Sequence, residues 1–447
     1  MTSSLLADRQ ENGLQLQLQD KLQPAISMNV LWLSSANILF NEKGDRTYNG
    51  KGWIGSLADA VQEFAPQTEL SVAFISSGKD KVTERDGITY YSIKSRKPEG
   101  IKKLMYNWTG YPSESYDDRI LEIANMAKPD VIHVFGAESK LSSWLLHAEA
   151  IPTTLHIQGI LTECIEHFFS EDIKPSDFLS CNSFFNEAVL RNGYLHLYND
   201  FKTRAAKERK YLSSVKFAMG RTDWDRNVLK KLSSASYSHV DEVLRPVFYK
   251  NAGIWKPDSN RHKKKLLSTI SEMPYKGIDT ILKTAVILKK KGIEIEWNVA
   301  GVREDSALVR IFEKKFNISG KENGVRFIGV QNEEQLVRLM ESSDIYIHPS
   351  HIENSPNSLC EAQMTGIPTI AAASGGTATI ADYGKASILY NDGDCFSLSE
   401  IICNLAEDCN MAEKTGIAGQ KTAARRHDRK QIVTDLLTAY NTARKSL

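Results

Sequence analysis

The polarity of the chain alternates from Met28 onward, because short apolar runs are separated by amphipathic runs of helix length. This alternation predicts a parallel α/β architecture, with helices covering the faces of a sheet. In the first half we expect a helix over residues 53–64 and strands at residues 28–35, 70–77, 130–135 and 153–159. Residues 220–225 (GRTDWD) are expected to end the last strand of this series.

A second alternating series begins at residue 264. Strands are predicted at residues 264–271, 293–301, 325–330, 344–350 and 367–373, and helices are predicted to start at Ile278, Ser306, Asn332 and near Pro356. The first of these helices carries apolar side chains three or four positions apart, which gives it one apolar face for a sheet. Residues 246–265 combine turn residues with a lysine cluster and predict a linker. The chain from about Met411 is predicted to be helical and basic.

The length of 447 residues agrees with two domains of roughly 100–200 residues each. We expect one doubly wound α/β domain over residues 28–245 and a second over residues 246–425. Residues 1–27, rich in Gln and Leu, are expected to form a flexible or weakly helical extension, with Met28 as an alternative start. The remaining residues, 426–447, are expected to form a terminal helix.

Composition excludes several classes of protein. The 56 Lys and Arg residues balance 55 Asp and Glu residues, whereas a dedicated nucleic-acid binder carries a basic surplus. None of the six cysteines forms a C-x-x-C pair, so neither a zinc knuckle nor a thioredoxin-type redox pair is predicted. The N-terminus lacks the features of a signal peptide, and no run of about 18 apolar residues predicts a membrane-spanning helix. We therefore expect a cytoplasmic protein with reduced thiols.

Residues 200–216 predict a helix with a basic face, since six Lys and Arg residues there outnumber two acidic residues. Two interpretations stay open. Such a face is usually just solvated, but it is also suited to contact with anionic lipid head groups.

The most informative segment is residues 348–376. Its strand ends at Pro349, and Glu353 follows in a loop. Pro356 suits the first turn of the next helix, with Ser355 as its N-cap. Gly366 is expected to end that helix.

Glu353 and Glu361 are thus predicted on either side of a helix N-terminus, at the carboxyl end of a parallel strand where open α/β sheets bind ligands. The N–H groups of Asn357, Ser358 and Leu359 would suit a diphosphate. Carboxylates beside a diphosphate are useful as acceptors for hydroxyl groups of a ribose and a sugar, which indicates a nucleotide sugar. The alternative is structural, namely a capping glutamate and an exposed helix glutamate.

This segment, P-S-H-I-E-N-S-P-N-S-L-C-E-A-Q-M-T-G-I-P-T-I-A, resembles the E-x7-E motif of the retaining glycosyltransferases of family 4. Further resemblance lies in residues 128–139 (KPDVIHVFGAES), 275–288 (YKGIDTILKTAVIL) and 327–350. The text ENSPNSLCEA is similar to bacterial capsule and surface-polysaccharide members. The resemblance implies the GT-B fold, in which two Rossmann-like domains face a central cleft and the last helices cross back to the first domain.

The resemblance also implies roles for residues of the second domain. Glu353 would hold hydroxyls of the donor sugar, and Glu361 would hold the ribose. Lys276 would clamp the diphosphate, although the arginine that the family has about five positions earlier is replaced by Ser271. Either Lys276 acts with the helix N-terminus alone, or another cation substitutes. The candidates for that cation are Arg303 and Arg221.

The remaining donor contacts are expected at turns after strands. Gly50 and Gly52 open the first helix and resemble the family's glycine loop, which faces the donor diphosphate. Gly301, in WNVAG, and Val330, in FIGVQ, are assigned to the donor by the same resemblance.

On the acceptor side, Gln158 stands where many relatives have histidine, so it is expected to orient and hydrogen-bond its partner without titrating. Gly159, Arg221 and Asp223 are placed near the cleft. A salt bridge within the first domain is the alternative for the last two. Retaining transfer would proceed by attack on the same face, with the leaving phosphate taking the proton of the acceptor.

His348 and His351 form an H-x-x-H pair, but the segment is a strand and a loop, without the helical spacing that lets two histidines share a metal. We expect His348 to pack at the strand end and His351 to line the loop. No metal and no cofactor are expected, and the resemblance implies a metal-independent enzyme.

The resulting hypothesis is a cytoplasmic, retaining hexosyltransferase, peripheral on the inner face of the membrane if the basic helix binds lipid. It would move a sugar from a nucleotide-sugar donor, UDP-linked by expectation, to a glycan or polyprenyl-linked acceptor in surface-polysaccharide biosynthesis. Nucleic acid is not an expected partner. Two alternatives remain: a nucleotide-sugar 2-epimerase, and a non-catalytic paralogue that binds sugar nucleotides.

Overall fold

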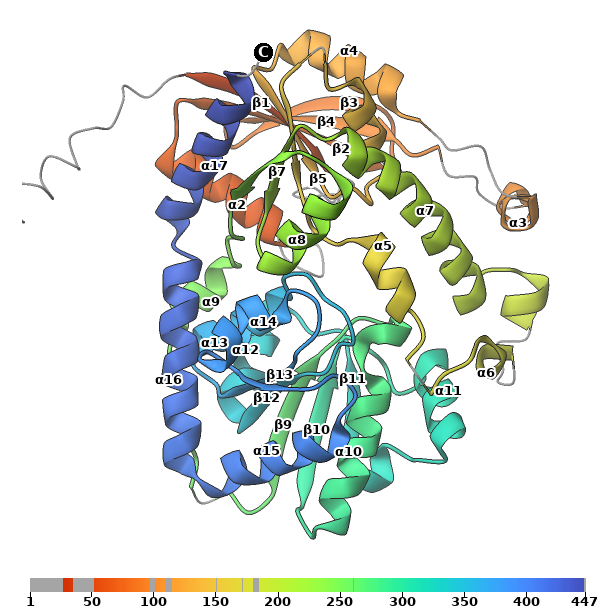
Figure 1. The fold of residues 1–447 in the computed structure, drawn as a ribbon, viewed down its shortest axis with the longest axis vertical. Helices are drawn as coiled ribbons and strands as arrows, with labels where there is room; N and C mark the ends of the chain where they lie inside the picture. Colours follow the sequence, from red (N-terminus) through yellow and green to blue (C-terminus); the bar gives the residue numbers. More distant parts are fainter. Residues whose placement is uncertain are drawn as a thin grey trace, which may run out of the picture.

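In a computed structural model, the protein consists of two parallel α/β domains placed end to end (Figure 1). The structure describes residues 27–34, 52–96, 101–109, 115–149, 151–170, 172–179, 185–259 and 261–445. The predicted fold class, two doubly wound Rossmann-like domains, is confirmed. Residues 1–26 of the expected extension and the predicted donor residue Gly50 lie outside the described residues.

The first domain is built on an eight-stranded sheet with the order β3-β4-β2-β1-β5-β6-β7-β8. Its strands are β1 (Met28–Ser34), β2 (Thr68–Ser76), β3 (Lys81–Arg85), β4 (Ile88–Lys94), β5 (Val131–Phe135), β6 (Thr153–His156), β7 (Phe217–Gly220) and β8 (Ser236–His239). All neighbours pair in parallel except β3 and β4. The carboxyl ends of β5, β6 and β7 therefore lie at one edge of the sheet.

Two features of this sheet differ from the prediction. The β3–β4 hairpin was not predicted, although Asp86 and Gly87 both have positive φ, as the tight turns of hairpins require. Gly220 ends β7, as residues 220–225 predicted for a strand end, but β7 is not the last strand, so that part of the prediction is wrong. The last strand is β8, a short and polar edge strand (SYSH) without apolar periodicity.

Helices cover both faces of this sheet. The helices of this part of the chain with side chains in the cores on its faces are α2 (Gly52–Phe64), α4 (Asp117–Ala127), α7 (Tyr194–Ser214) and α8 (Asp223–Leu232), together with the 3₁₀ turn η1 (Ser142–His147). The same part of the chain also forms α3 (Ile101–Thr109), α5 (Leu161–Cys164) and α6 (Pro175–Leu179), with short 3₁₀ or π turns at η2 (Ile165–His167) and η3 (Phe185–Val189). The basic helix predicted at residues 200–216 is α7, which starts one and a half turns earlier.

The second domain has a fully parallel six-stranded sheet with the order β11-β10-β9-β12-β13-β14. Its strands are β9 (Lys264–Thr269), β10 (Ile295–Ala300), β11 (Val325–Gly329), β12 (Ile345–His348), β13 (Thr369–Ala372) and β14 (Ile388–Tyr390). Its helices are α9 (Pro246–Lys250), α10 (Ile278–Lys290), α11 (Ala307–Phe316), α12 (Glu333–Ser342), α13 (Asn357–Thr365), α14 (Thr377–Ile380), α15 (Cys395–Glu407) and α16 (Cys409–Arg426), with 3₁₀ turns at η4 (Pro274–Lys276), η5 (Lys321–Asn323) and η6 (Asp382–Gly384).

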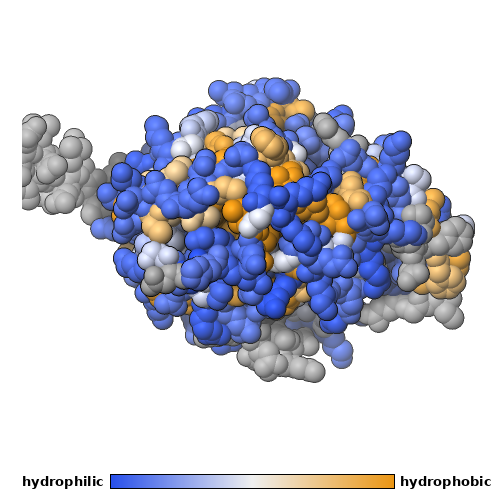
Figure 2. Space-filling model, turned by 90° about the horizontal axis from the view of Figure 1, so that it is seen from below, coloured by the Kyte–Doolittle hydropathy of each residue, from blue (hydrophilic) through white to orange (hydrophobic). Residues whose placement is uncertain are grey.

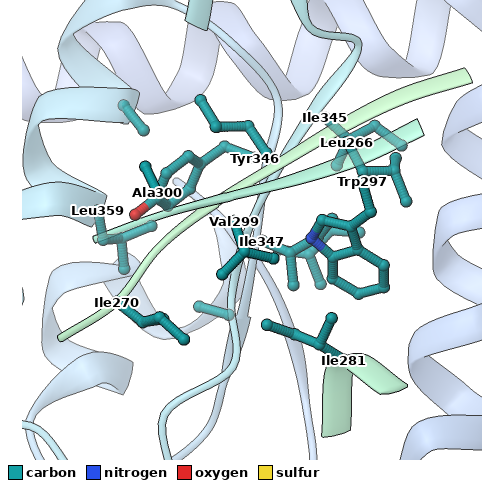
Figure 3. Close-up of a cluster of buried hydrophobic side chains, with 14 of the residues drawn as sticks. Leu266, Ile270, Ile281, Trp297, Val299, Ala300, Ile345, Tyr346, Ile347 and Leu359 are labelled. Carbon is teal, nitrogen blue, oxygen red and sulfur yellow. The ribbon is translucent and has the colours of Figure 1, made fainter. Parts of the chain in front are cut away.

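The core of the second domain is shown in Figure 3, where Trp297 and Tyr346 lie among aliphatic side chains. Both aromatic residues are fully buried. The Trp297 Nε1 donates to Ser268 Oγ at 3.0 Å, and that hydroxyl donates to the Ile347 carbonyl at 2.8 Å. These two hydrogen bonds link β10, β9 and β12, three of the strands whose carboxyl ends carry the predicted donor residues.

The prediction that residues 246–265 form a linker is wrong, because side chains of this segment pack into the second domain. Phe248 and Trp255 belong to the core of that domain. The Trp255 Nε1 donates to the Ser343 carbonyl at 2.7 Å, and the Gly253 N–H donates to the Met364 carbonyl at 3.0 Å. Lysine and turn residues dominate the composition of the segment and conceal its two large apolar anchors.

The chain returns to the first domain at its end. Helix α16 packs along α13, and α17 (Arg429–Arg444) continues upward beside α2, as the blue helices in Figure 1 show. Buried side chains of α17, including Leu436 and Tyr440, join the core formed by β1 and α2. The Tyr440 hydroxyl accepts a hydrogen bond from Trp32 Nε1 at 2.9 Å and lies 2.7 Å from His133 Nδ1.

The surface of the second domain, seen from its free end in Figure 2, is mainly hydrophilic, with apolar residues gathered in a band across the middle. Within the described residues, no helix combines the length and apolar character needed to cross a membrane.

Replacing Tyr440 with Phe should lower the free energy of unfolding by about 1–3 kcal/mol, because Trp32 Nε1 and His133 Nδ1 lose a buried partner. Urea denaturation would measure the change. The control is Thr438→Ala, on the exposed side of the same helix, which should cost much less. Equal effects of the two substitutions would contradict the hydrogen-bonded anchor.

Candidate functional site between the two domains

The loop after β12 carries Glu353, whose carboxylate forms an ion pair with Lys276 Nζ. Lys276 ends the turn η4 after β9, and Gly277 follows it with φ of 81°. A Cβ at Gly277 would lie 2.2 Å from the Pro349 carbonyl oxygen, so only glycine lets the lysine turn close onto this loop. Burial alone would raise the pKa of Glu353, but Lys276 lowers it below its usual range, so the pair is ionised.

The two histidines of the H-x-x-H pair have separate environments. His348 is buried at the end of β12, and burial lowers its pKa to about 4, which keeps the ring neutral. His351 lies between two carboxylates, with Nε2 3.0 Å from Asp279 Oδ1 and Nδ1 2.8 Å from Asp392 Oδ1. Burial lowers the pKa of His351, but the two aspartates outweigh this and raise it to about 10. His351 therefore holds the loop onto α10 as a cation.

The N-terminus of α13 differs in two details from the prediction. Pro356 is its N-cap, and the Ser355 hydroxyl donates instead to Glu242 at 2.7 Å, so the predicted Ser355 cap is wrong. The Leu359 N–H donates to the Pro356 carbonyl at 2.9 Å, and its side chain lies in the core of Figure 3, so this predicted anion contact is also wrong. Within the described chain, the N–H groups of Asn357 and Ser358 have no acceptor.

Glu361 is bound by an arginine from the segment between the domains. Arg245 donates from Nε and Nη2 to the two carboxylate oxygens of Glu361, both at 2.7 Å. Both side chains are nearly buried. Burial raises the pKa of Glu361, and Arg245 opposes that shift. A ribose hydroxyl at Glu361 would have to share an oxygen with Arg245 or displace it.

The loop after Glu353 also contacts the first domain. The Asn354 amide donates to the Gln158 carbonyl at 3.1 Å and to Asp225 Oδ2 at 3.0 Å, and it accepts from the Thr222 hydroxyl at 2.6 Å. On its other side the loop rests on Gly376, where a Cβ would lie 2.1 Å from the Asn354 carbonyl oxygen. Glu353 is thus held at the junction of the two domains.

The predicted residues of the first domain divide into two groups. Gln158 and Gly159 follow β6 and are half-buried at the junction. Asp223 contacts the second domain through the Tyr383 hydroxyl, which donates to it, and also pairs with Arg226 at 3.2 Å. Arg221 lies behind this surface, only 3% exposed, with its guanidinium over the Trp53 ring and 3.7 Å from Glu242.

Other predicted donor residues lie at strand and helix ends. Gly52 begins α2 with φ of 60°. Gly301 follows β10, where a Cβ would lie 1.9 Å from the Ile270 carbonyl oxygen. Val330 follows β11 and is 52% exposed. Arg303, the other candidate for the second cation, is largely exposed and forms an ion pair with Asp305.

Within the described residues, one group of potential metal ligands consists of Glu242, Cys360 and His427, whose ligand atoms lie within 4.8 Å of one another. The guanidinium of Arg221 already neutralises Glu242. The Cys360 thiol donates to Glu242 at 3.2 Å, so it is protonated. This grouping is a hydrogen-bonded contact between domains and does not fit a cation.

Sequence reasoning missed three residues of the junction: Arg245, Asn354 and Glu138. Glu138 comes three residues after β5, at the edge where the predicted strand 130–135 had to end, so its position in the sequence was a usable signal. Arg245 and Asn354 gave no such signal, because their partners lie more than 100 residues away.

Comparison with known proteins gives one family match. Residues 252–422 match the model of glycosyl transferases group 1, so the resemblance predicted from the E-x7-E segment is confirmed. A 2-deoxystreptamine N-acetyl-D-glucosaminyltransferase of Niallia circulans is 25% identical over 36% of this chain and 39% of its own. The amylovoran biosynthesis glycosyltransferase AmsK of Erwinia amylovora is 23% identical over 32% of this chain and 36% of its own. The match thus spans about two fifths of these curated relatives.

Solved structures resemble the whole fold. Sucrose-phosphate synthase from Thermosynechococcus elongatus has a TM-score of 0.65 at 13% identity, over 94% of this chain and 99% of its own. Anabaena HepE, solved in complex with UDP and glucose, has a TM-score of 0.58 at 14% identity, over 93% of this chain and 100% of its own. At these identities the likeness concerns the fold.

Replacing His351 with Gln should destabilise the protein by about 3 kcal/mol near pH 6, because Asp279 and Asp392 lose their shared cation. A histidine pKa raised from 6.5 to about 10 contributes stability that is complete below pH 6.5 and is lost as the pH rises through 10. The difference from wild type should therefore shrink between pH 6 and pH 10.

Urea unfolding at pH 6, 8 and 10 would measure this difference. The control is His262→Gln at an exposed position, which should change little at any pH. A His351→Gln difference that grows with pH would contradict a charged His351.

Proposed function

We propose that this protein, whose residues 252–422 form a group 1 glycosyltransferase domain, is a retaining glycosyltransferase that uses a nucleotide-sugar donor. The second domain would bind the donor and the first domain the acceptor. The observation that carries the proposal is the Lys276–Glu353 pair, placed at the carboxyl ends of β9 and β12 and beside the N-terminus of α13.

Each group of this pair has a function once a donor is present. The Lys276 ammonium and the N–H groups of Asn357 and Ser358 would neutralise the diphosphate, including the charge that develops as it leaves. Glu353 would then exchange its lysine for hydroxyl groups of the donor sugar. Gln158 would orient the acceptor, and the leaving phosphate would take the acceptor's proton. We infer that the reaction needs no metal ion, because the Lys276 ammonium and the N–H groups at the start of α13 supply the positive charge.

A UDP-linked hexose is the proposed donor, with support from the UDP and glucose bound by HepE, which has the same fold. Synthesis of a surface polysaccharide is the proposed process, with support from the amylovoran enzyme AmsK. The acceptor would be a glycan or a polyprenyl-linked sugar. Contact with an anionic membrane at the cytoplasmic face would be made by α7, whose Lys202, Arg209 and Lys210 are exposed.

Replacing Lys276 with Ala should reduce kcat/KM for UDP-glucose by about 100-fold or more, because a preorganised cation is lost where the leaving diphosphate gains charge. Release of UDP would be followed, and the sugar products would be separated to exclude epimerisation. The control Lys290→Ala, at the exposed end of α10, should keep normal activity. Near-normal kcat/KM in Lys276→Ala would overturn the assignment.

A triple variant in which Gln replaces each of Lys202, Arg209 and Lys210 should bind more weakly to vesicles that contain phosphatidylglycerol. Each basic residue near an anionic surface contributes about 1 kcal/mol to the binding free energy. Cosedimentation would measure this binding. A matched control replaces three exposed basic residues of α16: Lys414, Lys421 and Arg425. Binding that does not depend on anionic lipid would rule out the contact.

A further inference from the structure

Glu138 presents a carboxylate at the edge of the first domain that faces the Lys276–Glu353 pair. It follows β5 by three residues. Its neighbour at the carboxyl end of the sheet is Gly159, which follows β6 and where a Cβ would lie 3.9 Å from Glu138 Oε1. The side chain folds back over Gly136, where φ is 78° and a Cβ would lie 2.6 Å from Glu138 Oε2. Only glycine at 136 leaves room for the carboxylate in this place.

One oxygen of this carboxylate is buried without a partner. Glu138 Oε2 is shielded from solvent and has no hydrogen-bond donor in the described residues. The backbone N–H groups of Gly159 and of Glu138 itself interact with the carboxylate. Arg204 lies near, but it donates to the Glu138 backbone carbonyl, at 3.0 Å. A buried carboxylate oxygen without a donor is rare and calls for a ligand or a water molecule.

Glu208, a buried glutamate of the same region, has a complete set of donors. Glu208 accepts hydrogen bonds from the N–H groups of Leu161 and Thr162 and from the Thr162 hydroxyl, at 2.7–3.0 Å. Both of its oxygens are satisfied, so it has a structural role at the start of α5. Glu138 lacks this complete set of donors.

The charged groups around Glu138 place it next to the proposed reaction centre. Glu208 and Arg204, both on α7, act on its ionisation. The Cys164 thiol on α5 and the Tyr275 hydroxyl are each within electrostatic range of both Glu138 and Glu353, and the thiol also of Lys276. Tyr275 and Ile352 of the second domain pack with Leu161 and Phe201 of the first. Glu138 therefore approaches the centre from the domain that is proposed to bind the acceptor.

We propose that the Glu138 carboxylate binds a hydroxyl group of the acceptor, and that the bound part of the acceptor is a neutral sugar or polyol. The proposal rests on the proposed function. A hydroxyl is the donor that the unpartnered oxygen lacks. An anionic group would meet the carboxylates of Glu208 and Glu353. Of the two nearby cations, Arg204 donates to the Glu138 carbonyl, and Lys276 is paired with Glu353 and is the proposed ligand of the diphosphate.

The ionisation of Glu138 agrees with this role. Burial raises its pKa to about 7, and Glu208 adds to the shift against the opposing backbone N–H groups and Arg204. The ionised form accepts a hydroxyl hydrogen bond, so acceptor binding should strengthen as the pH rises through 7. The same shift means that ionisation costs stability, and this cost appears between pH 4.5 and 7.

The first test compares wild type, Glu138→Gln and the exposed control Glu166→Gln with UDP-glucose as donor. The acceptor probes are para-nitrophenyl glycosides of glucose, galactose and N-acetylglucosamine, with glucose 6-phosphate as an anionic probe. In Glu138→Gln, kcat/KM for a neutral acceptor should fall by about tenfold or more, while UDP release without acceptor stays within about twofold. The rise of acceptor kcat/KM between pH 6 and 8 should disappear in this variant alone.

Equal losses of transfer and of acceptor-free UDP release would overturn the proposal, and so would unchanged transfer or a preference for glucose 6-phosphate. If the wild-type protein neither releases UDP nor transfers glucose, it is the proposed function that fails.

The second test needs no turnover. Thermal unfolding at pH 8.5 should give Glu138→Gln a higher Tm than wild type, and the difference should be smaller at pH 5.5, where wild-type Glu138 is protonated in the folded state. Glu166→Gln should not show this pattern. A lower Tm of Glu138→Gln at pH 8.5 would mean that the carboxylate already has structural partners, and it would overturn the proposal whatever the activity.

Discussion

The contact between the two domains depends on one buried carboxylate, that of Glu242. It is fully buried and lies between Arg221 of the first domain and the Ser355 hydroxyl and Cys360 thiol of the second. Burial would raise the pKa of Glu242, but Arg221, His427 and Arg426 lower it below its usual range, so it remains charged. A buried charge without partners costs several kcal/mol, so the segments that supply these partners have to meet at Glu242.

Several positions of the candidate site follow from this constraint. Ser355 precedes α13, so its bond to Glu242 fixes the start of that helix, and Arg245, three residues after Glu242, holds Glu361 one turn further along. The loop that leads into α13 carries Glu353 toward Lys276 and Asn354 toward Asp225. The balanced net charge of +1 hides this arrangement, because most charged groups at the junction are paired with partners from distant parts of the chain.

The chemistry that the sequence made visible was local. Glu353, Gly366 and the small residues between them occupy one continuous stretch, so the helix end at Gly366, where φ is 83°, was predictable. Details that depend on the third dimension were not. Ser355 is a good N-cap by type, yet a buried carboxylate 113 positions away binds its hydroxyl more strongly than the helix end would. Glu361 gave no sign in the sequence of its arginine, because Arg245 is the last residue of the predicted first domain and lies 116 positions earlier.

The sequence by itself determined the two parallel sheets, because the period of apolar residues fixes strand and helix type wherever both faces of a sheet are buried. It also determined which loops carry polar chemistry, since these follow the strands. Tertiary structure alone decided the polar edge strand β8, the packing of residues 246–265, and the partners of Glu242, Arg245 and Glu138. Burial strengthens interactions between charges and makes unpaired polar groups costly, and burial is a property of the folded chain that residue type does not reveal.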